Sequence, residues 1–462
     1  MKMIVFIRRS FQIFFLILFI YLFLPNIHPP YSIPQNLFFI IDPLIAIFIS
    51  ITSQRFFWWT LFAFVMILAT LFLGRFYCGW ICPLGTLIDI CGALRKSHFG
   101  HRIDNLRFIK YYVLAGIIIF LLFGIQILWA LDPTVIAARF FSFNLALAKN
   151  SYRYLYAWVS AAFFLFIIVT SLIKRRLWCS VICPLGALYA VLARFSFVER
   201  VVKRCTKCMV CIDNCRMSAI KNNLTYHKEE CILCMDCLYD CKMGKTEFIL
   251  RPYRRYYHEN KDGLSRREFL FLMLGSFLSI GLLRSKGSIV TKDLIRPPGA
   301  LEEEEFLDRC IRCGNCMTNC ITNGLQPVMF ESRIVDIWTP KLVPEIGYCA
   351  YDCNLCGRVC PTGAIQNLSL EEKRSFRLGV ANIERSLCLN WAKDIDCKIC
   401  YENCPLPEKA IKLVRDISYN GKTIFRPYVD KTICIGCGTC QNKCPQRPIR
   451  AIRVSPKNIT RF

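Results

Sequence analysis

Cysteine spacing constrains this chain more than any other feature of its sequence. Twenty-four of its 29 cysteines fall into six groups of four, and most groups have the spacing C-x2-C-x2-C-x3-C. In bacterial ferredoxins this spacing lets three thiolates bind one [4Fe-4S] cluster, while the fourth thiolate binds the neighbouring cluster. The sequence therefore predicts six [4Fe-4S] clusters whose cysteine groups work in pairs.

Pairing in chain order gives six ligand sets, named sites A to F. From A to F they are Cys205, Cys208, Cys211 and Cys241; Cys231, Cys234, Cys237 and Cys215; Cys310, Cys313, Cys316 and Cys360; Cys349, Cys353, Cys356 and Cys320; Cys434, Cys437, Cys440 and Cys404; Cys388, Cys397, Cys400 and Cys444. The sequence leaves crossed pairing among the last four groups open. Two sites depart from the regular spacing. In site D three residues, and not two, separate the first two cysteines, and in site F the first cysteine lies nine positions before the second.

Zinc binding and disulfide formation are the alternatives to iron–sulfur clusters. Zinc sites also use C-x2-C pairs, but four cysteines within eleven residues, repeated almost unchanged, fit zinc poorly. Disulfides form in exported domains, but cysteines only three positions apart would close strained loops. The spacing therefore favours iron–sulfur clusters.

Hydropathy predicts a membrane domain in the first part of the chain. Hydrophobic residues make up 55% of the sequence and the mean hydropathy is +0.38, which exceeds that of ordinary soluble domains. Uncharged runs at 10–25, 56–74, 111–131 and 154–173 predict four spans. A further apolar run at 37–51 is interrupted by an Asp-Pro pair, so we expect an interfacial or re-entrant helix there.

The distribution of basic residues predicts the orientation of these spans. The loops at 1–9 and 75–110 carry nine Lys and Arg residues, and the opposite loops carry four. The positive-inside rule therefore places the N-terminus and residues 174–267 in the cytoplasm. The formal net charge is +26, of which six cysteine-ligated clusters at roughly −2 each would offset about 12. We therefore expect no nucleic-acid partner.

A second apolar run, at 269–283, follows the sequence S-R-R-E-F-L, which contains Arg266 and Arg267. This pattern is typical of a twin-arginine export signal. The alternative is a chance Arg-Arg pair before an ordinary fifth span. Both interpretations place residues 284–462 outside the cytoplasm, and no small-x-small cleavage site follows, so we expect the run to remain as an anchor helix.

Two further cysteine pairs reveal an internal duplication. Cys78 and Cys82, and likewise Cys179 and Cys183, form C-x3-C turns followed by Pro-Leu-Gly. Positions i and i+4 share one helix face, so the four thiols would meet if the two halves fold together. They would then hold a cofactor; the alternatives are structural packing or a redox-active thiol pair.

Each half of the duplication also carries an Asp-Pro pair upstream, at Asp42 and Asp132, and both are predicted near the outer membrane face. Carboxylates at such depth are costly and often functional. Oxidation of a quinol releases two protons, so Asp42, Asp132 or the nearby His28 are candidate catalytic bases. The alternative is that each Asp-Pro pair only begins a helix.

These motifs resemble two subunits that usually occur as separate proteins. Residues 1–250, with two C-x3-C-P turns and a two-cluster domain, are similar to the membrane subunit of the periplasmic nitrate reductase quinol dehydrogenase. Residues 263–462, with the twin-arginine motif and four cysteine groups, are similar to its exported polyferredoxin subunit and to the methylamine-utilisation ferredoxin. The resemblance implies a fusion that carries electrons from menaquinol to an exported acceptor. The C-x3-C-P turns also resemble those of the nitrous-oxide reductase regulator and of a copper-oxidase maturation protein.

The expected fold is an α-helical membrane domain with four spans and a fifth anchor helix, joined to α+β bacterial ferredoxin-like domains. The predicted domains are 1–200, the four-span domain; 201–250, a cytoplasmic two-cluster ferredoxin domain; 251–290, the linker and anchor; and 291–462, the exported four-cluster domain. We expect residues 201–262 in the cytoplasm.

The expected function is quinol oxidation coupled to electron delivery outside the cytoplasm, with membrane lipid, the quinone pool and an exported reductase or cytochrome as partners. The sequence contains no C-x-x-C-H haem motif, no dinucleotide-binding G-x-G-x-x-G after a strand and no Walker A loop. The chain therefore resembles a conduit rather than a complete reductase. The alternatives are an assembly or maintenance reductase for another metalloenzyme, and a scaffold whose clusters are structural.

Overall fold

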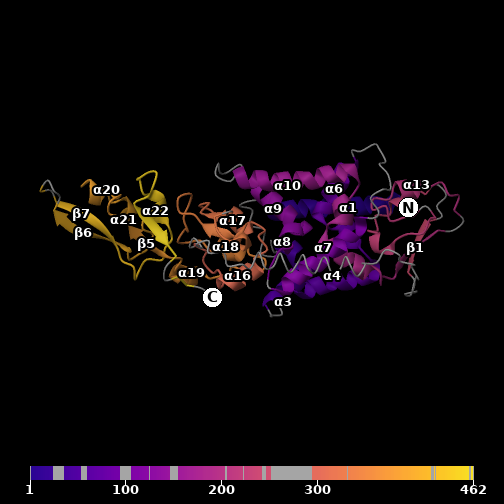
Figure 1. The fold of residues 1–462 in the computed structure, drawn as a ribbon, viewed down its shortest axis with the longest axis horizontal. Helices are drawn as coiled ribbons and strands as arrows, with labels where there is room; N and C mark the ends of the chain where they lie inside the picture. The colour runs from indigo at the N-terminus through magenta and orange to yellow at the C-terminus, as the bar shows by residue number, and fades with distance from the viewer. Residues whose placement is uncertain are drawn as a thin grey trace. The chain divides into compact units, whose positions relative to one another are not determined.

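The computed structural model describes residues 2–23, 36–53, 60–93, 106–123, 125–145, 154–202, 205–221, 223–241, 246–250, 294–329, 331–417, 421, 423–456 and 459–460. The chain divides into two compact units. The first unit contains residues 1–145 and 157–285, and the second contains residues 286–462 with 146–156. In Figure 1 the helices of the first unit run from indigo to magenta, and the second unit runs from orange to yellow.

Four apolar helices in the first unit occupy the uncharged runs: α1 Lys2–Phe23, α4 Thr60–Leu73, α7 Ile109–Leu122 and α10 Tyr154–Ile173. Within the described residues, only the stretch Met3–Phe23 is long and apolar enough to meet the criterion for a membrane span, and the other apolar helices are shorter. The predicted anchor helix at 269–283 and the twin-arginine motif lie outside the described residues.

The duplicated halves have matching helical elements. Each half begins with a short helix and an Asp-Pro break, then continues with a longer helix, an apolar helix, a short cysteine helix and a proline-led helix. Besides the apolar helices α4 and α10, these elements are α2 Leu37–Ile40, α3 Pro43–Ser53, α5 Phe76–Trp80 and α6 Pro83–Ala93 in the first half, and α8 Leu128–Leu131, α9 Pro133–Leu145, α11 Leu177–Val181 and α12 Pro184–Ala193 in the second.

The uncharged run at 111–131 does not form one continuous helix. Helix α7 ends at Leu122 and α8 begins at Leu128. Hydropathy does not distinguish one helix from two consecutive ones, so the sequence prediction of a single element was wrong. The break makes the second half match the first, in which the apolar run at 37–51 divides into α2 and α3.

A small ferredoxin domain completes the first unit. Its two strands, β1 Val198–Val202 and β2 Thr246–Leu250, are antiparallel, with Val198 opposite Leu250. Short helical segments lie within or beside the cysteine motifs of sites A and B: α13 Val210–Asp213, η4 Lys228–Glu230 and α14 Asp236–Tyr239. This arrangement of a two-stranded sheet and short helices is the expected α+β ferredoxin-like pattern.

The described part of the second unit contains short helices and three two-stranded antiparallel sheets, with strand orders β3-β4, β5-β8 and β6-β7. Its elements are α16 Glu303–Arg309, α17 Asn315–Thr318, β3 Leu325–Pro327, η5 Ile334–Asp336, β4 Pro340–Leu342, α18 Leu355–Arg358, α19 Leu370–Ser375, β5 Val380–Ile383, α20 Leu389–Ala392, α21 Ile399–Glu402, β6 Ile411–Ile417, β7 Thr423–Val429, α22 Thr439–Lys443 and β8 Ile452–Ser455. With strands this short, cysteine-rich loops make up much of the interior of the unit.

Candidate iron–sulfur sites

The four regularly spaced cysteine loops share one backbone conformation. In each loop the residue just before the second cysteine and the residue just after it have positive φ angles; these pairs are Lys207 and Met209, Leu233 and Met235, Arg312 and Gly314, and Gly436 and Gly438. Non-glycine residues rarely adopt such angles, and each costs on the order of 1–3 kcal/mol. Left-handed residues in turns direct backbone N–H groups into concavities that bind anions in many iron–sulfur sites. The repeated left-handed conformation therefore fits loops built around an anionic cluster.

The two irregular sites have a different loop conformation. At the corresponding position after the second cysteine, Asn354 in site D has φ −127° and Lys398 in site F has φ −113°. The longer spacing before these cysteines therefore coincides with the loss of the left-handed residue. The irregular spacing of sites D and F is therefore accompanied by a different backbone conformation of the cysteine loop.

Three ligand sets line hollows in the structure. Each hollow brings three cysteines of one motif together with a fourth from the neighbouring motif, as chain-order pairing predicts. The thiol-bearing residues are Cys215, Cys231, Cys234 and Cys237 at site B; Cys320, Cys349, Cys353 and Cys356 at site D; and Cys388, Cys397, Cys400 and Cys444 at site F. This placement favours chain-order pairing over crossed pairing at these sites.

The ligand sets of sites C and E lie in buried groups beside their partners. Cys310, Cys316 and Cys360 of site C pack in one group with Cys356 of site D. The group around site E contains its cysteines 404, 434 and 440 and also the cysteines 388, 400 and 444 of site F. Site A is more open, because Cys205 and Cys208 are exposed.

Burial changes the acid–base properties of the ligand thiols. It raises the pKa of Cys231 to about 11 and the pKa of Cys349 and Cys400 to about 12, because the charged thiolate is disfavoured away from water. These thiols would therefore be protonated at neutral pH unless a cation replaced the proton. Iron supplies that positive charge and binds the thiolate form. The donor set thus fits a [4Fe-4S] cluster at each site, whose chemistry is one-electron transfer.

The ligand sets of the second unit form a continuous row in the order C, D, E, F. Sites C and D share one buried group, as do sites E and F. Between the pairs, the backbone N–H of Cys349 in site D donates a 2.8 Å hydrogen bond to the carbonyl of Cys437 in site E. Neighbouring sites therefore touch along the whole row, which is the arrangement that electron transfer between clusters requires.

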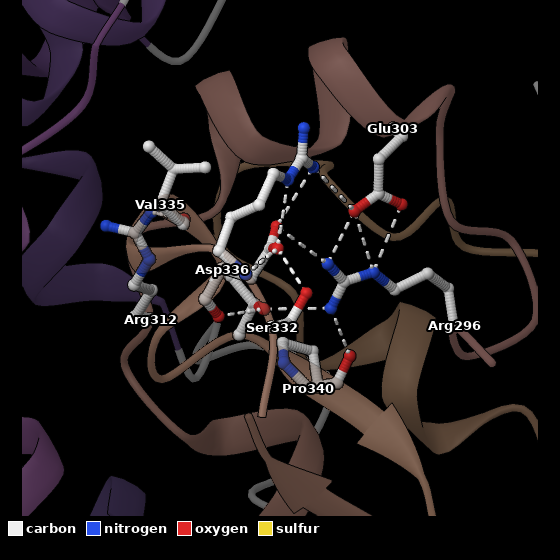
Figure 2. Close-up of polar contacts among 9 residues, drawn as sticks. Arg296, Glu303, Arg312, Ser332, Val335, Asp336 and Pro340 are labelled. Atoms are coloured by element: carbon white, nitrogen blue, oxygen red, sulfur yellow. Dashed lines mark hydrogen bonds and ion pairs between the residues drawn. The ribbon is translucent and has the colours of Figure 1, made fainter. Parts of the chain in front are cut away.

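A buried ion-pair cluster supports the first part of this row. Figure 2 shows the guanidinium of Arg296 between Glu303 and Asp336, with Arg296 hydrogen-bonded to the carbonyl of Pro340 at 2.9 Å. Arg296 also lies over the ring of Phe306 in α16, 4.8 Å from its centroid. The cluster holds the entry segment of the second unit against the helix that leads into site C.

A second buried network joins the ferredoxin domain to the helices of the first unit. Asp89 on α6 accepts hydrogen bonds at 2.7 Å from Arg176 and at 3.0 Å from Gln12, and it pairs at 2.9 Å with Arg216 of the ferredoxin domain. Glu230 of the ferredoxin domain pairs with Arg75 at 2.8 Å and with Lys110. Removing one partner of such a buried pair typically costs about 3–5 kcal/mol, so the network fixes this domain on the helical bundle.

The four thiols of the duplicated C-x3-C turns lie in the interior of the first unit. Cys78, Cys82, Cys179 and Cys183 are all buried. Cys91, the one cysteine outside the six groups and the two C-x3-C pairs, is partly buried. Within the described residues, no group of three or more His, Cys, Asp or Glu side chains is arranged to hold a single metal ion, and this applies equally to the thiols of sites A to F.

The two Asp-Pro carboxylates lie together in the interior of the bundle. Thr134 donates a 3.0 Å hydrogen bond to Oδ2 of Asp42, while Oδ1 of Asp42 accepts the backbone N–H of Leu44. Oδ1 of Asp132 accepts the N–H of Thr134 at 2.9 Å. Both aspartates are fully buried and begin their helices, as the capping interpretation expects. The third candidate, His28, lies outside the described residues.

Sequence reasoning missed the charged and hydroxyl groups around these sites. Arg75 and Arg176 each lie three positions before the first cysteine of a C-x3-C turn. Aligning the two halves of the duplication would have revealed these arginines as a matched pair. No comparable sequence signal distinguishes Tyr77 or Tyr189, because isolated tyrosines in apolar segments are common.

These features define an iron–sulfur electron-transfer protein of the ferredoxin type. A family model described as a 4Fe-4S binding domain matches residues 43–102 and 156–204, and a model described as a 4Fe-4S dicluster domain matches residues 395–447. The two segments of the first match contain one C-x3-C pair each. Ferredoxin-type 4Fe-4S domains, predicted from cysteine spacing, are therefore confirmed.

Similar proteins identify the family more closely. The methylamine utilization ferredoxin-type protein MauM of Methylobacillus flagellatus is 34% identical over 216 residues, which are 46% of this chain and 88% of that protein. The ferredoxin-type protein NapG of Escherichia coli is 32% identical over 172 residues, 36% of this chain and 72% of that protein. The chain belongs to the family of ferredoxin-type proteins that includes MauM and NapG.

A third relative has a different name. The methylamine utilization ferredoxin-type protein MauN of Methylorubrum extorquens is 32% identical over 147 residues, which are 31% of this chain and 47% of that protein. No solved structure matches the chain.

Replacing Cys444 by Ser tests the pairing of the motifs. The change is expected to remove about four iron atoms from site F, although Cys444 belongs to the cysteine motif of site E. Alkylation of the folded variant without oxygen, followed by mass spectrometry, should then label the three remaining thiols of site F, Cys388, Cys397 and Cys400. Labelling of the site E cysteines instead would contradict the pairing, and Cys91→Ser is the control that should lose no iron.

Replacing Arg296 by Met tests the ion-pair cluster of Figure 2. The change removes a buried cation from two carboxylates and is expected to lower the free energy of unfolding of the second unit by about 3–5 kcal/mol. The measurement is the temperature at which the full chain loses its iron–sulfur absorbance. Arg374→Met breaks an exposed pair with Asp352 and should change that temperature little. Equal effects of the two substitutions would argue against a structural role for Arg296.

Proposed function

We propose that this chain oxidises quinol in the cytoplasmic membrane and passes the electrons through its [4Fe-4S] clusters to an exported reductase or cytochrome. The observation that carries the proposal is the unbroken row of ligand sets C, D, E and F, because a row of touching sites suits conduction rather than isolated structural clusters. The family provides the electron-transfer class. Quinol as the donor and an exported acceptor are our additions.

The membrane arrangement is part of the proposal. In it, α1, α4, α7 and α10 are the four spans, and residues 201–262 lie in the cytoplasm. A fifth helix at 269–283 anchors the exported domain of residues 291–462. The apolar character of these helices and the greater number of basic residues in the loops assigned to the cytoplasm support this arrangement. The first 250 residues would then correspond to the membrane subunit of a quinol dehydrogenase, fused to its polyferredoxin partner.

The buried carboxylates are the proposed proton acceptors for quinol oxidation. In both aspartates Oδ1 caps a helix, so only Oδ2 is available for chemistry. Oδ2 of Asp42 is already bonded to Thr134, whereas Oδ2 of Asp132 has no hydrogen-bond partner among the described residues. Asp132 is therefore the better placed base. Capping and proton transfer are then complementary roles of one carboxylate rather than alternatives.

Tyrosine hydroxyls extend this polar cluster. The hydroxyl of Tyr189 is buried and, in the described part of the chain, has no hydrogen-bond partner, whereas the buried hydroxyl of Tyr77 interacts with Thr134. The two rings lie 5.4 Å apart, and both side chains interact electrostatically with Asp42 and Cys82. Buried polar groups without partners are costly, so they mark a site where a polar ligand or a transferred proton would be accommodated.

Replacing Asp132 by Asn tests the proposed base. Membranes that contain the full chain should reduce their clusters when given a menaquinol analogue, and the variant should do so about 100-fold more slowly, because a positioned base typically contributes that much. Reduction by dithionite should be unchanged, which shows that the clusters are intact. Asp352→Asn, at an exposed site of the second unit, is the matched control.

Two results of this experiment would reject the proposed donor. Clusters that stay oxidised with quinol, yet are reduced by a cytoplasmic ferredoxin or flavoprotein, would favour an assembly or maintenance reductase. Clusters that no reductant in the redox range of the cell can reduce would favour a structural scaffold.

Replacing Arg266 and Arg267 by Lys tests the proposed export. The twin-arginine route exports folded cargo and recognises the arginine pair, so a reporter fused after Phe462 should no longer appear outside the cytoplasm. The chain offers a matched control in a nearby Arg-Arg pair, Arg254 and Arg255, which should tolerate the same change. Undiminished export of the Arg266 and Arg267 variant would mean that an ordinary fifth span carries the second unit across.

A further inference from the structure

We propose that the four thiols of the C-x3-C turns together hold a seventh iron–sulfur cluster, shared by the two halves of the internal duplication. Each half contributes two thiolates: Cys78 and Cys82 from the first, and Cys179 and Cys183 from the second. Binding would replace the thiol protons by iron, so the protons leave and no redox step is involved. The site is named site G. Its existence does not depend on quinol as the electron donor, whereas its use as a relay does.

The two halves present their thiols in the same way. Cys82 and Cys183 stand immediately before the proline-led helices α6 and α12, and their sulfurs accept the backbone N–H of Gly85 at 3.4 Å and of Gly186 at 3.2 Å. N–H donors to a cysteine sulfur stabilise its thiolate, and they tune the potential of cysteine-ligated clusters. The two halves therefore hold equivalent sulfurs at the same position, directly before a proline-led helix.

Electrostatic contacts connect the thiols across the duplication. Cys82 interacts with Cys78 of its own half and with Cys179 of the other half. Cys183 likewise interacts with Cys179 in its own half and with both cysteines of the first half. All four side chains are between 4% and 8% exposed, so the group is closed to water. Four buried thiols on two turns that contact each other would make a complete ligand set for one cubane cluster, whereas either pair alone would not.

Two arginines cross between the halves and provide positive charge. Arg75 of the first half donates a 3.5 Å hydrogen bond to the carbonyl of Cys179, and Arg176 of the second half donates a 2.7 Å bond to the carbonyl of Cys78. Both guanidinium groups are buried, and both interact electrostatically with Cys78 and with Cys179. Because each arginine bonds to a backbone carbonyl of the opposite half, the two C-x3-C turns are held together as a single site.

The surrounding network contains more cations than anions. Among the described residues, two sets of ion pairs join five cationic side chains to three carboxylates, which leaves a net charge of +2; the members are Arg8, Arg75, Lys110, Arg176, Arg216, Asp89, Glu230 and Asp236. Buried charge without compensation is costly. A cysteine-ligated cluster carries roughly −2, so an anionic cluster beside these side chains would offset the excess positive charge.

Site G lies directly beside site B. The indole N–H of Trp80, within the first C-x3-C turn, donates a 3.1 Å bond to the carbonyl of Leu233. At Gly79 an added Cβ would lie only 2.2 Å from the carbonyl of Ile232, so glycine allows the two turns to touch. Ile232 and Leu233 separate the first two cysteines of site B. A cluster at site G would thus exchange electrons with site B through one layer of backbone.

This position suggests a use for site G within the proposed function. A cluster inside the bundle, close to the carboxylates Asp42 and Asp132 on one side and to site B on the other, would link quinol chemistry to the ferredoxin domain. The shared neighbours are Tyr77 and Tyr189, which interact with both the thiols and Asp42.

Native mass spectrometry of the full chain, purified without oxygen, tests the site. The fully loaded species should carry seven clusters, about 28 iron atoms, and the double variant with Cys78→Ser and Cys179→Ser should carry six, about 24. The Cys91→Ser control should keep all seven. A fully loaded unaltered chain with six clusters, whose four C-x3-C thiols react with an alkylating agent after unfolding, would overturn the proposal.

The test remains decisive if the double variant also loses sites A and B. In that case the count in the unaltered chain decides alone, because seven clusters require a ligand set beyond sites A to F. A single bound metal ion, or a disulfide within the group, would appear as a distinct mass and would also reject site G. Quinol-dependent reduction is a separate measurement, so site G and the proposed donor can fail independently.

Discussion

The interlocking of cysteine motifs is the constraint on which the ferredoxin parts of this structure depend. Each motif gives its fourth cysteine to the ligand set of its neighbour, so neither motif of a pair is complete alone. In the described residues of the second unit each sheet has two strands, and the buried groups contain several ligand cysteines. Clusters at these sites would therefore add stability that so small a hydrophobic core does not provide, as metal sites do in many small domains.

Charge links this constraint to the rest of the chain. Clusters ligated by thiolates are anionic, and the structure places buried arginines beside several ligand sets. Arg75 and Arg176 face the duplicated thiols, while Arg296 organises the segment before site C. Some of the basic residues that give the chain its positive net charge therefore lie where anionic clusters would be bound. The same ion pairs, through Asp89 and Glu230, fix the small ferredoxin domain on the helices.

Local patterns predicted much of this architecture. Helix α10, Tyr154–Ile173, occupies the predicted run because twenty apolar residues without proline or charge favour one continuous helix. Cysteine spacing anticipated which thiols line common hollows at sites B, D and F. The repeated Asp-Pro and C-x3-C motifs anticipated the matching halves. In each case neighbours in sequence determine the feature, so the sequence carries the information directly.

Features that depend on tertiary contacts were not predictable. The break between α7 and α8 follows from how the second half repeats the first, which hydropathy does not encode. The bond between Thr134 and Asp42 joins two halves separated by about ninety residues. The contacts of Arg75 and Arg176 were equally unpredictable, because each guanidinium bonds to a carbonyl of the opposite half of the duplication.

The central claim is that the chain carries a row of electrically connected iron–sulfur clusters. Low-temperature electron paramagnetic resonance of the intact, dithionite-reduced chain tests it most directly. Neighbouring reduced clusters in contact interact magnetically, so we expect broadened, split signals rather than the sum of isolated ones. A reduced chain with no iron signal, or with only the narrow signals of isolated clusters, would contradict the account.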